Sequence, residues 1–234
     1  MTNDKGGRQK AASFSLHLRR TLGFCLGAYI MGLGIALTTN ANLGTTPISS
    51  LPYVCTFLTP LSFGSLTFCI NALMVVAQKL LLGPAFEKKA LLQLPAVLVF
   101  SLFIDLNMWL TKTFITNVYA LQMGMCVLGS FVLAVGITLC VLSNATVMPG
   151  EGVVLAIAHV VRIDFGRIKV IFDCSLVLLA AVVSLAVLHR LEGLREGTVV
   201  SAVLTGTFVR FLYPRAAGRL MPFFAARETE KGTA

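Results

Sequence analysis

Long apolar segments separated by short polar ones dominate the chain. No Asp, Glu, Lys, Arg or His occurs between Thr21 and Gln78, a stretch of 58 residues, or between Thr113 and Gly150. A helix needs about 20 apolar residues to cross the core of a bilayer, so the first stretch alone accommodates two spans and a neutral linker. The pattern predicts six spans, at Thr21–Thr39, Ser62–Leu82, Ala90–Thr111, Ala120–Ser143, Val170–Leu188 and Gly197–Tyr213.

The composition agrees with this pattern. Of the 234 residues, 56% are hydrophobic and 12% are charged, and the mean hydropathy is +0.85. A soluble domain is usually about a quarter charged. A soluble enzyme, a disulfide-rich secreted module and a disordered chain are therefore excluded. We expect an all-α membrane protein, whose first partner is the lipid bilayer.

The basic residues predict the orientation. The net charge is +9, but Lys and Arg lie mostly at the ends of apolar segments, which favours topology over nucleic-acid binding. If the amino terminus is cytoplasmic, sixteen Lys and Arg lie inside and three lie outside, at Lys112, Arg190 and Arg195. We expect residues 1–20 to form a basic cytoplasmic arm before an uncleaved first span, and residues 214–234 to form a cytoplasmic tail.

An internal repeat organises the sequence. A shift of 102 residues aligns Gly27 with Gly129, Gly34 with Gly136, Asn42 with Asn144, Pro47 with Pro149, Phe63 with Phe165 and Gly64 with Gly166. The two copies would occupy residues 21–111 and 112–213. Three spans is an odd number, so the second copy enters the membrane from the opposite side. The prediction is two inverted three-helix repeats, an arrangement common in transporters, although a duplicated scaffold that does not transport is the alternative.

The linkers after the first span of each copy are the candidate site. Each contains an Asn and small polar residues before a Pro, which favours the first turn of a helix. The linkers therefore predict short half-helices starting at Pro47 and Pro149, whose amino termini would face polar or anionic groups at membrane depth. The alternative is a pair of interfacial loops whose Asn and Thr cap helix ends. The candidate substrate-binding residues are Asn42, Thr45, Thr46, Asn144, Thr146 and Glu151.

Asp105, Asp173 and Arg210 lie within predicted spans, where charge is costly and often functional. The repeat places Asp105 opposite Arg210, which predicts a structural ion pair. Asp173 corresponds to Asn71, and both an interfacial role and a coupling role are open. The six cysteines are solitary and no catalytic or phosphate-binding motif occurs, so we expect no metal, no cofactor and no enzymatic activity.

The segments Gly34–Ser50 (GIALTTNANLGTTPISS) and Met148–Gly152 (MPGEG) resemble the YczE/YitT-like family of bacterial membrane proteins. The resemblance extends over about Leu18–Tyr213. It implies a small multi-pass protein of the bacterial cytoplasmic membrane, and it implies no substrate.

Two functions follow as hypotheses. The first is a small-molecule or ion permease with its site between the two linkers. The second is a non-transporting regulator, or a binding subunit of a larger membrane complex. A homo-oligomer and a membrane-protein partner are both compatible with the sequence.

Overall fold

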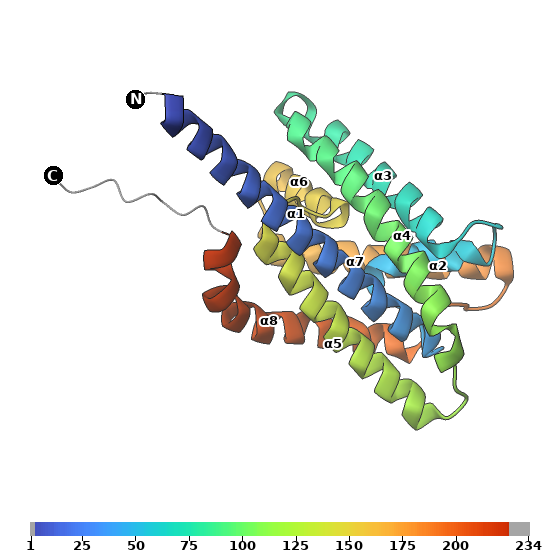
Figure 1. The fold of residues 1–234 in the computed structure, drawn as a ribbon. Helices are drawn as coiled ribbons and strands as arrows, with labels where there is room; N and C mark the ends of the chain where they lie inside the picture. The colour runs from blue at the N-terminus through green and yellow to red at the C-terminus, as the bar shows by residue number, and fades with distance from the viewer. Residues whose placement is uncertain (1–2, 225–234) are drawn as a thin grey trace.

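A computed structural model describes residues 3–224, and these are almost entirely helical (Figure 1). No strand occurs in this part of the chain, so the all-α class is confirmed. Short 3-10 turns precede α4 and follow it, and a π-helical turn at Ser184–Leu188 extends α7. The helices are α1 (Asn3–Asn40), α2 (Pro47–Thr56), α3 (Phe63–Leu82), α4 (Gln93–Thr111), α5 (Tyr119–Ser143), α6 (Pro149–Val161), α7 (Phe165–Val183) and α8 (Glu196–Phe224).

Within the described residues, five helical segments are long and apolar enough to cross a membrane, which marks a multi-pass membrane protein. The sixth predicted span, Gly197–Tyr213, lies inside α8 and is not among them, because three Thr and Arg210 lower the hydropathy of that stretch. The five segments are Phe14–Asn40, Phe63–Ala85, Lys88–Phe114, Tyr119–Ser143 and Phe165–Leu188.

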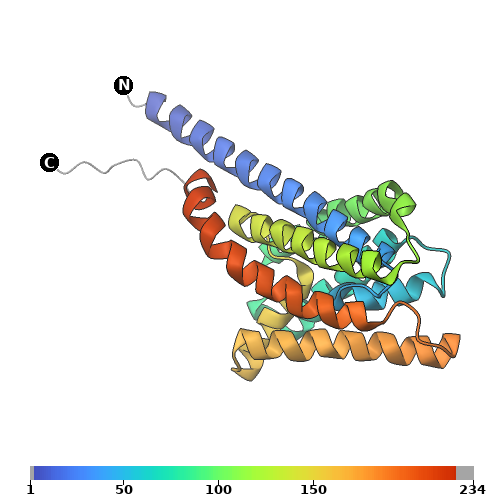
Figure 2. The same cartoon turned by 90° about the horizontal axis from the view of Figure 1, so that it is seen from below.

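The antiparallel pair α1 and α5 forms the centre of the bundle (Figures 1 and 2). Its contact depends on glycine. A Cβ added to Gly136 would lie 2.5 Å from the backbone nitrogen of Met31, and one added to Gly34 would overlap the backbone of Leu133. The same added Cβ at Gly136 would lie 2.8 Å from the carbonyl oxygen of Gly27. The expectation that these glycines serve close helix packing therefore agrees with the structure.

The other helices surround this pair. α4 packs against α1 and α8 packs against α5, so α4 and α8 lie on opposite sides of the centre. α3 contacts both α4 and the short helix α6, while α7 contacts the short helix α2. A core that includes Ile35, Phe100, Ile104 and Leu133 joins α1, α4 and α5.

The end of α8 contacts α1 at one end of the bundle (Figure 2). α1 begins at Asn3, so the predicted arm 1–20 continues into the first span as one helix. α8 continues through Pro214, which cannot donate the backbone hydrogen bond of a regular helix, and Figure 2 shows that α8 curves along its length. Arg20 Nε then donates a hydrogen bond of 3.0 Å to the Phe224 carbonyl. The predicted tail 214–234 is thus helical to Phe224, and its remainder lies outside the described residues.

Substitution of the central glycines tests the α1–α5 contact. We expect Gly34→Ala and Gly136→Ala each to destabilise the protein by about 1–3 kcal/mol, because the new methyl group forces two backbones apart. Gly124→Ala is the matched control in α5, since its Cβ would meet nothing within 4 Å. Thermal unfolding in detergent measures the difference. Equal melting temperatures for Gly136→Ala and Gly124→Ala would contradict the importance of this contact.

Candidate functional site

The two linkers begin with the same backbone turn. Asn42 has φ 57° and Asn144 has φ 49°, both in the left-handed region, just after α1 and α5 end. Asparagine is the residue after glycine that tolerates this conformation best. Both residues therefore lie where their helices end, which agrees with the alternative of Asn at helix ends. A role of the two side chains in substrate binding stays a prediction.

The chain resumes its helical course at a proline in both linkers. α2 begins at Pro47 and α6 begins at Pro149, and neither preceding residue, Thr46 or Met148, caps the helix with its side chain. Thr46 instead donates a hydrogen bond of 2.9 Å to the Ser49 hydroxyl. Neither helix start is therefore capped by the side chain that precedes it, and the alternative of interfacial loops stays open. The first-turn N–H groups keep their capacity to bind polar groups.

The first linker is closed. Thr45 and Thr46 are 0% and 3% exposed, and the Thr45 hydroxyl shares a hydrogen bond of 2.8 Å with that of Thr39. The start of α8 covers the segment, because a Cβ on Gly197 would lie 2.5 Å from the Leu43 carbonyl oxygen. This side of the molecule leaves no room for a solute at the two threonines.

The second linker is open and lines a pocket of about 160 Å³. This volume is below the range of about 300–1,000 Å³ for sites that hold drug-sized ligands, so it suits an ion or a solute of a few heavy atoms. The pocket contains three of the six predicted binding residues. Its lining residues are Met31, Ile137, Cys140, Val141, Asn144, Thr146, Val147, Met148 and Glu151.

Only Asn144, Thr146 and Glu151 of the six candidate residues line this pocket, and a site shared by the two linkers stays a prediction. Ser143 lies beside Gly23 at one end of the α1–α5 pair, whereas the first linker follows Asn40 at the other end. At 1.5 Å per residue, the 17 residues of α1 between Gly23 and Asn40 correspond to about 25 Å. Only the half-helix starts meet, where Ile48 contacts Gly150.

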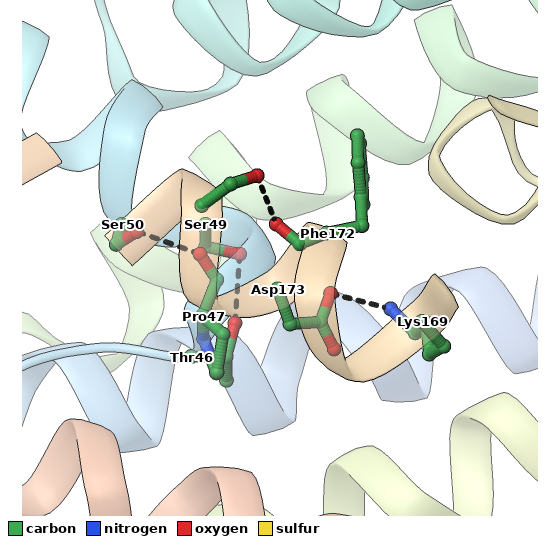
Figure 3. A network of polar contacts seen from close by, with 8 residues as sticks. Thr46, Pro47, Ser49, Ser50, Lys169, Phe172 and Asp173 are labelled. Carbon is green, nitrogen blue, oxygen red and sulfur yellow. Dashed lines mark hydrogen bonds and ion pairs between the residues drawn. The ribbon is translucent and has the colours of Figure 1, made fainter. Parts of the chain in front are cut away.

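An ion pair on α7 lies close to the pocket at the second linker. Lys169 Nζ pairs with the Asp173 carboxylate at 2.7 Å, on the face of α7 beside the first turn of α2 (Figure 3). Both charges act on the Glu151 carboxyl, which itself makes no hydrogen bond or ion pair within residues 14–224. Sequence reasoning overlooked Lys169, although its i,i+4 spacing to Asp173 is the pattern of a helical ion pair.

Asp105 does not pair with Arg210, so the predicted structural ion pair between these two residues is wrong. Its carboxylate accepts hydrogen bonds from the Gly64 amide at 2.7 Å and from the Ser62 hydroxyl at 2.6 Å, and so holds the start of α3. Arg210 is exposed. The physical reason is that α4 and α8 lie on opposite sides of the α1–α5 pair, so residues that correspond in the repeat do not meet.

The fold and site define a helical, multi-pass membrane protein with a small pocket that contains Asn144, Thr146 and Glu151 among apolar side chains. The chain belongs to a family of unknown function, DUF6198, whose model matches residues 18–214. No curated protein and no solved structure matches the chain. The similarity to the YczE/YitT-like proteins stays a prediction. In the described part of the chain, no three His, Cys, Asp or Glu side chains converge as a metal site would require.

The role of Asp105 is testable by removal of its carboxylate. We expect Asp105→Ala to lower the free energy of unfolding by about 1.5–3 kcal/mol, because two hydrogen bonds to a charged acceptor are lost. Arg210→Ala is the control and should change stability little. Thermal unfolding of both variants in detergent provides the measurement. If the two variants were equally destabilised, the predicted Asp105–Arg210 pair would regain support.

The turns at Asn42 and Asn144 predict a distinction between glycine and alanine. At either position Asn→Gly should retain stability, whereas Asn→Ala should cost about 1 kcal/mol, because a Cβ without a polar group is disfavoured in the left-handed region. Chemical denaturation of the four single variants measures this. Equal effects of Gly and Ala would show that the amide side chain, and not the turn, determines stability.

Proposed function

We propose that this protein is a permease for a small solute or ion, built from two inverted repeats of three spans each, with α8 as the sixth span. No catalytic step is part of the proposal. The resemblance to the YczE/YitT-like family would place it in the bacterial cytoplasmic membrane, and the distribution of Lys and Arg would place both termini in the cytoplasm. The hydrogen bond between Arg20 and Phe224 supports a common side for the two ends.

The repeat is supported by backbone features at the same offset. The left-handed residues Asn42 and Asn144 are 102 positions apart, and so are the prolines that start α2 and α6. Helix contacts also occur in corresponding pairs: α1 with α4 and α5 with α8, α2 with α3 and α6 with α7, and α3 with α6 and α7 with α2. Two halves that fold alike can exchange conformations, which is the basis of alternating access.

The observation that carries the proposal is the difference between the two linkers. Thr45 is fully buried, whereas its counterpart Val147 is 42% exposed and lines the pocket. The half that contains the closed linker is also more tightly packed, because α3 packs along α4, whereas the corresponding helices α7 and α8 have no comparable contact. Closed and open forms of one motif within a single chain are what a transporter with inverted halves requires in one of its two states. In the other state the first linker would open and the second would close.

The proposal is tested by a screen in which ions and small metabolites are added to the detergent-purified protein and the melting temperature is measured. A ligand that binds only the folded state raises it by mass action. We expect a stabilising compound whose effect is lost in Asn144→Gly, which removes a pocket amide but keeps the turn. Asn42→Gly makes the same change at the closed linker and should retain the effect.

The compound is then offered to proteoliposomes that contain the protein. Uptake above that of empty liposomes supports a permease. Binding without uptake would contradict transport and favour the binding subunit of a larger complex. A compound that still stabilises Asn144→Gly would not occupy this pocket, and the proposed site would be wrong.

A further inference from the structure

The pocket at the second linker is electrically unbalanced. Glu151 is the sole charged residue among those that line it, and the side chain is half-buried. Within residues 14–224 its carboxylate has no hydrogen-bond donor and no ion-pair partner. A half-buried carboxylate without a partner attracts a ligand that brings the missing counter-charge into the pocket.

The neighbouring charges do not supply that balance. Lys169 is the cation whose charge reaches Glu151 from α7, but it is already paired with Asp173 at 2.7 Å. The three groups together carry a net charge of −1 when Lys169 is protonated and both carboxyls are ionised. From α5, Cys140 faces the same pocket, and a neutral thiol adds no charge. The surplus negative charge attracts a cation.

Two of the neutral residues around Glu151 carry side-chain oxygen, the kind of ligand that binds a hard cation, whereas Met31, Ile137, Val147 and Met148 make much of the lining apolar. Asn144 and Thr146 bring an amide and a hydroxyl to the pocket. Cys140 and Val141 belong to the last turn of α5, which ends at Ser143, at the negative pole of the helix dipole. Their carbonyl oxygens accept hydrogen bonds from the Ser143 hydroxyl and the Asn144 backbone amide, and each keeps a second lone pair. Helix ends of this kind coordinate ions in transporters with broken helices. Glu151 lies in the first turn of α6, where the positive pole of the helix opposes the burial that raises the pKa of this carboxyl.

We propose that the pocket binds a small monovalent cation such as Na⁺, with the Glu151 carboxylate as the charged ligand and Asn144, Thr146 and the end of α5 as sources of neutral oxygen. A monovalent ion would neutralise the site, whereas a divalent ion would leave an excess positive charge in apolar surroundings. The inference rests on the proposed function, since it makes the pocket the ion site of the permease.

The test is a titration of the full-length protein in detergent with NaCl, in which choline chloride keeps the ionic strength constant. We expect a saturable rise in melting temperature, on the order of 3–6 °C when Na⁺ is at ten times its dissociation constant. Glu151→Gln, which keeps the shape and removes the charge, should give a flat titration. Glu87→Gln changes an exposed carboxylate between α3 and α4 and should behave as the wild type.

A second variant distinguishes loss of the cation site from loss of the fold. Thr146→Val keeps Glu151 and removes one oxygen, and it should shift the midpoint of the titration at least fivefold to higher Na⁺ with the same final melting temperature. A flat titration of the wild-type protein, or a Glu151→Gln variant that responds as the wild type does, would overturn the cation site. If Na⁺ has no effect but a solute from the screen still binds through Asn144, the permease stands and the cation site falls. If neither binds, both proposals fail.

Discussion

The close contact between α1 and α5 is the constraint on which the rest of the structure depends. Glycine carbonyls of each helix face glycines of the other, at Gly27 with Gly136 and at Gly34 with Gly129. In a membrane, lipid tails are as apolar as leucine side chains, so helices associate through close packing and not through exclusion of water. The glycines allow this approach, and α4 and α8 then pack on the two sides of the pair. The positions of both linkers follow, because each linker begins where one of these two helices ends.

Polar groups at membrane depth are satisfied mostly within the protein. Asn40 donates to the Thr111 hydroxyl at 2.8 Å, and Gln78 donates to the Pro149 carbonyl at 3.1 Å and exchanges hydrogen bonds with Gln93. Such contacts join α1 to α4, and α3 to the start of α6. An unpaired polar group costs several kcal/mol in hydrocarbon, and the described residues keep a few such groups, at the hydroxyls of Ser101, Thr198 and Thr205 and the amide oxygen of Asn107. The Glu151 carboxylate differs from these because it is charged and faces a pocket.

Local features could be predicted from the sequence, and features that depend on distant packing could not. The helices, the starts at Pro47 and Pro149 and the packing role of the glycines follow from short-range rules. The position of Asp105 does not, because it depends on which helix lies beside α4, and the repeat suggested Arg210 instead of the start of α3. Likewise, the two linkers look equivalent in sequence, and the packing of α8 over Leu43 closes one and leaves the other open.

The contact between α1 and the end of α8 has a consequence for biogenesis. Phe224 is buried against Gly23, beside Ser143 at the end of α5, so a residue of the first apolar segment is covered by one that is synthesised much later. Synthesis proceeds at about 5–20 residues per second. The separation of 201 positions from Gly23 to Phe224 therefore corresponds to a delay of about 10–40 s, during which this end of the glycine face of α1 is open to lipid or to the insertion machinery. Synthesis of α8 as far as Phe224, and not only insertion of the long apolar segments, is what seals this end of the bundle.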